Sequence, residues 1–263
     1  MINIMTGKLL LLFCLLFLTG CSMKPVNTAS EAVTPTPSAV PSTPPAETEK
    51  PSTMLPKETT PASEETAMAI PDYDSYFSIS KITTAIFARM QGKSYPEGCP
   101  LSLDTLRYLT VAYVNFDGEI CQGELVVNAE IAEDVISIFK ELFEEKYPIE
   151  KISLIDDYDA DDDRSMAANN SSAFCYRVIS GTDRLSNHSF GLAIDINPLY
   201  NPYIKSSGKV LPEEAEAFAD RTLSNPYYIC PEDRCVRIFK KYGFTWGGDW
   251  KNSKDYQHFE RKL

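Results

Sequence analysis

The sequence predicts an α+β domain over residues 72 to 263, with a small central antiparallel sheet flanked by helices. Two runs rich in β-branched and aromatic residues, 106 to 116 and 119 to 127, flank the turn signal Asp117-Gly118 and predict a hairpin. An apolar stripe at helical spacing follows over residues 131 to 142. Hydrophobic residues make up 43% of the chain, which is enough for the core of a single domain.

Two helices are expected around this hairpin. Ser80 can cap a helix over residues 81 to 90. Asn128 can cap a second helix that ends before Pro148. The buried face of this second helix is predicted to consist of Ile131, Val135, Ile138, Phe139 and Leu142.

A strand is expected over residues 149 to 155, and the acidic run 156 to 163 follows it. Alternating aspartates suggest a calcium loop, but the turn glycine and the late glutamate of an EF-hand are missing. We therefore interpret the run as a solvated loop, with structural calcium as the alternative.

Residues 174 to 179 and 192 to 197 both have strand character, and a turn is expected around 181 to 183. In the second strand, period-two alternation places Asp195 on one face, together with Ala193 and Asn197. Later elements are expected as a helix near 213 to 220, a helix from Pro231 to Gly243, a return through 244 to 246, and a short strand around His258.

The N-terminus has the features of a secretory signal peptide over residues 1 to 20. One positive charge precedes an apolar run of about ten residues, which is too short to span a bilayer. The run ends in Leu18-Thr19-Gly20-Cys21, which resembles the lipobox of bacterial lipoproteins. We expect cleavage before Cys21 and lipidation of its thiol. An ordinary signal peptide with a chance cysteine is the alternative.

Residues 21 to 71 are rich in Pro, Thr, Ser, Ala and Glu. Such a segment buries too little apolar surface to offset its ordering entropy, so we expect a disordered tether. The net charge of -12 argues against nucleic acid and against an anionic lipid surface as direct partners. We therefore expect an extracytoplasmic monomer that is anchored to the membrane only through its lipid.

Five cysteines remain after Cys14 and Cys21 are assigned to the signal peptide and the lipid. Five is an odd number, so at least one thiol is free. Cys230 and Cys235 are close enough to pair, but the chain has no CxxC motif, and we expect structural roles.

The chain contains two histidines, His188 and His258. A catalytic zinc takes three protein ligands and leaves a fourth position to water, and Asp195 would complete such a set. Asp255, three residues before His258, could lie near that water without being a ligand. For each histidine, the alternative is a buried side chain whose nitrogens are satisfied by hydrogen bonds within the protein.

Three motifs together are more specific: Ser186-x-His188-x-x-Gly191-x-Ala193-x-Asp195, Gly247-Gly248-Asp249-Trp250 and Asp255-x-x-His258-Phe259. They resemble zinc peptidases that include D-alanyl-D-alanine carboxypeptidases, among them those linked to vancomycin resistance, and L-alanyl-D-glutamate endopeptidases. These enzymes share the hedgehog/DD-peptidase fold.

The resemblance implies one catalytic zinc on His188, Asp195 and His258. It implies Asp255 as the catalytic carboxylate and Arg177 as the group that holds the substrate carbonyl or the oxyanion, although Arg177 could instead form a strand-edge ion pair. Supporting or substrate-binding roles are expected for Ser186, Trp246 and Trp250. The two tryptophans are expected to pack in the core or to form a wall of the cleft. Asp249 is expected to anchor the Gly247-Gly248 turn.

The implied function is hydrolysis of peptidoglycan stem peptides, most simply as a D-alanyl-D-alanine carboxypeptidase. An L-alanyl-D-glutamate endopeptidase is the alternative within this class, because the loops at 156 to 170 and 200 to 208 would decide between them. An alternative from another class is a non-catalytic envelope-binding lipoprotein that keeps the zinc.

Overall fold

The computed structural model of the protein describes residues 72–263. The predicted signal peptide, the tether and the lipidation site at Cys21 lie outside the described residues. The described part has the predicted α+β class. Its strands form four small sheets, three with three strands and one with two, where the sequence predicts one central sheet.

The first sheet contains the predicted hairpin. Strands β2 (Leu106–Val114) and β3 (Ile120–Asn128) pair antiparallel, with Leu109 opposite Leu125. Strand β1 (Ser78–Lys81) adds to the free edge of β2. The hairpin prediction is confirmed.

Helix α1 (Thr84–Met90) starts three residues later than predicted. Ser80 and Lys81 are not its cap and first turn, because they pair with β2 as part of β1. Thr83 caps the helix instead, and its side chain accepts a hydrogen bond from the backbone N–H of Ile86 at 3.3 Å.

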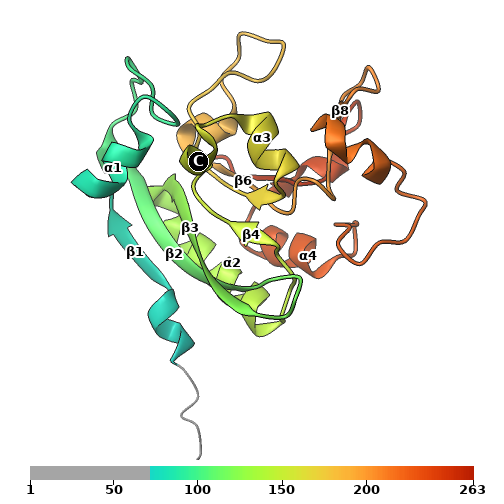
Figure 1. Cartoon of the computed structure of the whole chain (residues 1–263), viewed down its shortest axis with the longest axis horizontal. Coiled ribbons are helices and arrows are strands. Elements are labelled where there is room, and N and C mark those ends of the chain that lie inside the picture. Colours follow the sequence, from blue (N-terminus) through green and yellow to red (C-terminus); the bar gives the residue numbers. More distant parts are fainter. Residues whose placement is uncertain (1–71) are drawn as a thin grey trace, which may run out of the picture. The chain divides into compact units, whose positions relative to one another are not determined.

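Helix α2 (Ala132–Glu144) covers one face of this sheet (Figure 1). Asn128 caps the 3₁₀ turn Ala129–Ile131 that leads into it, accepting from the N–H of Glu130 at 3.0 Å. The predicted apolar face is buried and forms the centre of the main core. The helix is thus present as predicted, but Asn128 caps the 3₁₀ turn before it and not the helix itself, whose N-cap is Ile131.

Two predicted strands are shorter than expected or absent. Of residues 149 to 155, only β4 (Lys151–Ile152) is a strand, paired with β5 (Asn170–Ser171). The 3₁₀ turn Ile155–Tyr158 follows it. Residues 174 to 179 form no strand, because their backbone N–H groups bond to separate segments: Phe174 to Val126, Cys175 to His188 and Tyr176 to Ser94.

The acidic run is not simply a solvated loop, so that prediction is wrong. Asp156 is buried and accepts from the backbone N–H of Ser94 at 3.0 Å. Its last two residues begin helix α3 (Asp162–Ala167), which is capped by Asp161. Asp159 pairs with Lys93 and Arg164, so neighbouring cations already neutralise part of this charge.

Two small sheets in the C-terminal part carry the functional motifs. One has the order β6 (Ala193–Asp195), β11 (His258–Glu260) and β9 (Thr245–Trp246). The other has the order β10 (Lys254–Asp255), β7 (Tyr203–Ile204) and β8 (Val210–Leu211). The short strand predicted around His258 is therefore present.

The remaining helical segments are the 3₁₀ turns Tyr73–Tyr76, Leu103–Thr105, Asn187–Phe190, Glu213–Phe218 and Gly247–Asp249, and helix α4 (Arg234–Lys241). Helix α4 begins later than the predicted Pro231, because Asp233 caps it through the N–H of Cys235 at 2.7 Å. No helix within residues 72–263 is both long and apolar enough to cross a bilayer.

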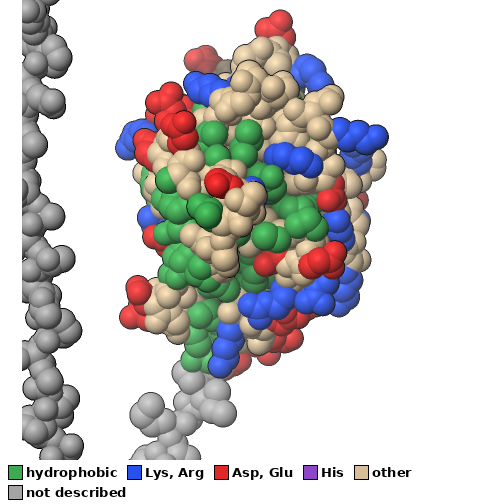
Figure 2. All heavy atoms as spheres, turned by 90° about the vertical axis from the view of Figure 1, so that its right-hand side faces the viewer, with side chains coloured by type: hydrophobic (Ala, Val, Ile, Leu, Met, Phe, Trp, Pro, Cys, Tyr) green, Lys and Arg blue, Asp and Glu red, His purple; other side chains and the backbone are tan. Residues whose placement is uncertain are grey.

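The five cysteines of the described residues are all free. Cys235 is buried in the main core, whereas Cys230 is exposed, so these two residues do not pair. The face of the domain in Figure 2 has a central group of hydrophobic side chains, with acidic and basic side chains around it.

Candidate metal centre

His188 lies on the 3₁₀ turn Asn187–Phe190, which two local features shape. The Ser186 hydroxyl caps the turn by accepting from the N–H of His188 at 3.3 Å. Gly191 ends it with φ +65°, and a Cβ there would lie 2.6 Å from the backbone nitrogen of Asn128. Glycine is required at this position both for its φ and for the close approach of the turn to the end of β3.

Asp195 and His258 lie directly opposite each other on the paired strands β6 and β11. Two neighbours across a sheet are held more rigidly than two loop residues, and their Cβ atoms are close enough for the side chains to meet. Both side chains, and that of His188, are buried, with 3 to 6% of each residue exposed.

Three side chains converge in this centre. The Nε2 atom of His188 lies 3.2 Å from Nδ1 of His258 and 3.1 Å from the Asp195 carboxylate. His258 Nδ1 lies 3.0 Å from Oδ1 of the same carboxylate, whereas His188 Nε2 contacts its Oδ2. Among the described residues, these three form a group that could hold a metal ion.

In each imidazole, the outer nitrogen, which faces away from the three convergent groups, contacts an acceptor that helps to define the tautomer. His188 Nδ1 lies 2.5 Å from the backbone oxygen of Ala173, and His258 Nε2 lies 3.1 Å from the Glu260 carboxylate. A carbonyl and a carboxylate accept hydrogen bonds, so both outer nitrogens carry the protons. When the inner nitrogens carry no proton, each ring directs a lone pair inward, where the Asp195 carboxylate adds further acceptor atoms.

Acceptor atoms at such short separations repel each other unless a cation or a proton lies between them. A tetrahedral zinc with ligands at about 2.0–2.1 Å has ligand pairs roughly 3.3 Å apart, close to the observed spacing. Burial lowers the pKa of His258, but hydrogen bonds to Asp195 and Glu260 outweigh it and raise that pKa to about 10. The donor set therefore fits a zinc ion, which would replace this proton.

Asp255 lies on β10 beside the three convergent groups. Its Oδ1 atom is buried and has no hydrogen-bond partner among the described residues. Burial raises the pKa of Asp255 to about 7, against the attraction of His258 and with a further contribution from the Asp195 charge. A carboxyl with this pKa can both take and give a proton near neutral pH.

Gly247 is explained by the approach of β10, and Gly248 by the indole ring of Trp246, 2.3 Å from where a Cβ would lie. A Cβ on Gly247 would lie 2.5 Å from the backbone oxygen of Asp255, so a larger residue would displace that strand. Asp249 is exposed and pairs with Lys240 at 2.7 Å. It therefore links the turn to α4.

Arg177 is fixed from two sides. Its backbone N–H donates to the Ser189 hydroxyl at 2.9 Å, beside His188 in sequence, and its guanidinium pairs with Asp162 at 2.8 Å. Its buried Nε has no hydrogen-bond partner among the described residues. Arg177 thus forms an ion pair, as in the alternative that the sequence leaves open, but it does not lie on a strand edge.

Two residues of this centre are missed by the sequence analysis. Asp162 is one of six aspartates in the acidic run, and nothing in the sequence distinguishes it from the others. Glu260 lies two residues after His258 in a strand, and this spacing places both on the same face. That spacing is the one signal that could have identified Glu260.

The two tryptophans differ in their surroundings. Trp246 is 1% exposed, and its indole N–H donates to the backbone oxygen of Tyr256 at 2.9 Å. It supports the segment between Asp255 and His258 from the core and is not available to a substrate. Trp250 is half-buried, with its ring 5.5 Å from that of His258, where it forms a wall of the centre.

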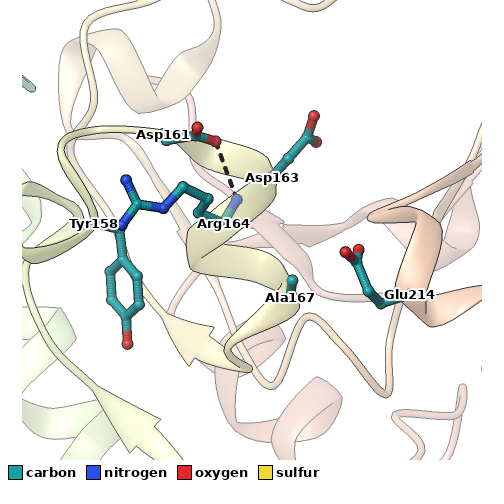
Figure 3. A pocket seen from close by; sticks show the side chains of 6 residues that line it. All are labelled: Tyr158, Asp161, Asp163, Arg164, Ala167 and Glu214. Carbon is teal, nitrogen blue, oxygen red and sulfur yellow. Dashed lines mark hydrogen bonds between the residues drawn. The ribbon is translucent and has the colours of Figure 1, made fainter.

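A separate pocket lies between α3 and the turn Glu213–Phe218 (Figure 3). Asp161, Asp163 and Glu214 contribute acidic groups to its lining, and Arg164 a basic one. Asp161 also caps α3 through the N–H of Arg164 at 3.1 Å. None of the three convergent metal-centre residues lines this pocket.

Residues 180–261 match the family model described as D-alanyl-D-alanine carboxypeptidase. This segment is similar to that peptidase family. It includes the three convergent residues and Asp255, whereas Asp162 and Arg177 lie before it. No solved structure matches the chain.

Proposed function

We propose that the protein is a zinc-dependent peptidase of the D-alanyl-D-alanine carboxypeptidase type. The observation that carries this proposal is the convergence of the side chains of His188, Asp195 and His258, whose nitrogen and oxygen atoms make contacts of 3.0 to 3.2 Å. The family match over residues 180–261 supports the same activity. Zinc bound to these side chains would polarise the scissile carbonyl and make a water molecule acidic.

The other residues of the centre have separate tasks in this proposal. Asp255 accepts the proton of the attacking water at its free Oδ1 atom and returns it to the leaving amine. Arg177 stabilises the negative charge that develops on the carbonyl oxygen, because a guanidinium stays charged at every physiological pH. Asp162 holds this guanidinium in position through their ion pair.

The proposed substrates are the stem peptides of peptidoglycan, and the proposed location is the outer face of a bacterial membrane. The predicted signal peptide and Cys21 support this location, because a lipid on Cys21 would hold the domain near the cell wall. The predicted tether would give the domain reach from that anchor.

Two substitutions test the chemistry. His258→Ala should lose bound zinc, measured by metal analysis after dialysis. Asp255→Asn should keep zinc but lose about 10²- to 10⁴-fold in kcat, the typical contribution of a general base. Zinc retained in His258→Ala at the wild-type level would contradict the metal centre, and full activity in Asp255→Asn would contradict the assigned base.

The bond that is cut can be identified by digesting purified muropeptides and weighing the products. Loss of one alanine supports the carboxypeptidase, and cleavage within the stem supports the endopeptidase alternative. If the zinc-bound protein leaves every muropeptide intact while a related enzyme cleaves them, the non-catalytic binding alternative replaces both. The unpartnered Asp255 Oδ1 favours an enzyme.

A further inference from the structure

Glu260 makes two short contacts that join the segments of both histidines. Its carboxylate lies 3.1 Å from Nε2 of His258, two residues earlier on β11. The same Oε2 atom accepts from the side-chain amide of Asn187 at 2.6 Å. Asn187 directly precedes His188, so this hydrogen bond connects β11 to the turn that carries His188.

The contact with Glu260 determines which nitrogen of His258 keeps its proton when a metal ion binds the ring. A neutral imidazole has one N–H and one lone pair, and either nitrogen can take either role. In the metal-free ring both nitrogens have an acceptor, because Nδ1 faces the Asp195 carboxylate at 3.0 Å and Nε2 faces the Glu260 carboxylate at 3.1 Å. Once a metal ion is bound to Asp195, Glu260 is the carboxylate that still accepts a ring proton, so the proton stays on Nε2 and the lone pair is left on Nδ1. Nδ1 is the atom that lies near His188 and Asp195.

Asn187 fixes the position of the Glu260 carboxylate relative to the His258 ring. Its amide donates to the Glu260 oxygen that also contacts the imidazole, which holds the carboxylate on the outer side of the ring. Glu260 is half-buried, so the contact is partly protected from competing water. His188 has an equivalent outer partner in the Ala173 backbone oxygen, and a side-chain substitution cannot remove that partner.

We propose that Glu260, held by Asn187, is a positioning residue that selects Nδ1 of His258 as the metal-binding atom and connects the two histidine segments. The inference rests on the proposed zinc centre. Outer partners of metal-bound histidines commonly change metal affinity by about 10- to 100-fold. We therefore expect Glu260→Ala to weaken zinc binding within that range.

The test combines zinc affinity with the nitrogen signals of His258. Zinc dissociation constants are measured by competition with a chelator for the wild type, Glu260→Ala, Glu260→Gln, Asn187→Ala and the control Glu133→Ala. Glu133 is exposed on α2 and its side chain makes no hydrogen bond or ion pair in the described residues. The chain has two histidines, so ¹⁵N labelling of histidine gives two ring patterns to assign.

In the zinc-bound wild type, His258 should show one species with a coordinated Nδ1 and a protonated Nε2. Glu260→Ala should bind zinc about 10- to 100-fold more weakly and show a mixture of ring states. Asn187→Ala should have a smaller effect in the same direction. Glu260→Gln keeps an acceptor oxygen, so it should retain the Nδ1 pattern and recover most of the affinity, which distinguishes positioning from a general loss of stability.

Glu260→Ala with a wild-type dissociation constant and an unchanged His258 pattern would overturn the inference and leave the zinc centre intact. A wild-type protein that binds no zinc would instead overturn the proposed function itself. A wild-type His258 that coordinates zinc through Nε2 would also contradict the inference, because Glu260 would then face the wrong nitrogen.

Discussion

The Asp162 carboxylate lies 2.8 Å from the Arg177 guanidinium, and this ion pair connects α3 to the metal centre. Burial raises the pKa of Asp162, although the charge of Arg177 opposes this effect. The pair holds the one cationic side chain to which the family resemblance assigns a role in catalysis. The acidic segment thus contributes the ion-pair partner of Arg177.

Asp162→Asn should lower kcat/KM about tenfold, which corresponds to ~1.4 kcal/mol of lost transition-state stabilisation. The amide keeps the size of the side chain but loses the charge that holds Arg177 in place. Zinc affinity should not change, because Asp162 is not among the three convergent residues. Steady-state kinetics and chelator competition measure the two effects separately.

Asp163→Asn is the matched control for this substitution. Asp163 is the next residue on α3 and is exposed. The two variants lose the same charge from the same helix. Equal losses of activity in both would show that the net charge near the site matters and that the ion pair does not.

Gly191→Ala should destabilise the fold and weaken zinc binding together. The alanine would have to adopt φ near +65°, and its Cβ would lie 2.6 Å from the Asn128 nitrogen. The left-handed conformation alone costs about 1–2 kcal/mol, and the close contact adds to it by moving the turn that carries His188. Thermal unfolding and zinc competition provide the two measurements.

Gly181→Ala separates the two contributions. Gly181 has φ +84°, yet nothing lies within 4 Å of a Cβ at this position. It should therefore show the conformational cost, about 1–2 kcal/mol, with zinc affinity unchanged. If Gly191→Ala behaves like this control, the close approach to Asn128 does not position His188.

Parts of the fold with strong local signals could be predicted from the sequence. The turn at Asp117-Gly118 fixes the hairpin, and the apolar period of α2 fixes its buried face. The grouping of His188, Asp195 and His258 could also be predicted, because motifs surround the two histidines of the chain. The first two signals lie within a few residues of the feature that they predict, whereas the grouping joins residues up to 70 positions apart and rests on the resemblance of the motifs.

Features that depend on distant partners could not be predicted. Residues 174 to 176 have strand character, but their N–H groups bond to three separate segments. The run of aspartates contains a buried Asp156 and a paired Asp162, and both roles depend on residues far along the chain, Ser94 and Arg177. The local pattern of apolar and polar residues does not indicate contacts with distant segments.

Zinc removal should lower the melting temperature by an amount that grows with pH. Hydrogen bonds to Asp195 and Glu260, opposed by burial, raise the pKa of His258 to about 10 in the metal-free protein. Because this folded-state pKa is raised from 6.5, the protonated ring stabilises the metal-free fold fully below about pH 6.5, and this contribution is lost as the pH rises through about 10. Zinc needs the neutral ring, so its binding must displace that proton.

Apparent zinc affinity should therefore increase about tenfold for each pH unit between roughly 7 and 9, or ~1.4 kcal/mol of added stabilisation at constant free zinc. The measurement compares melting temperatures of zinc-bound and chelator-treated protein at several pH values, with buffers chosen to keep free zinc fixed. His258→Ala, which lacks the titrating ring, is the control and should show no zinc-dependent shift. A zinc-induced shift in the wild type that stays constant over this range would mean that His258 is already neutral without metal, and that no proton occupies the space between the three ligand atoms.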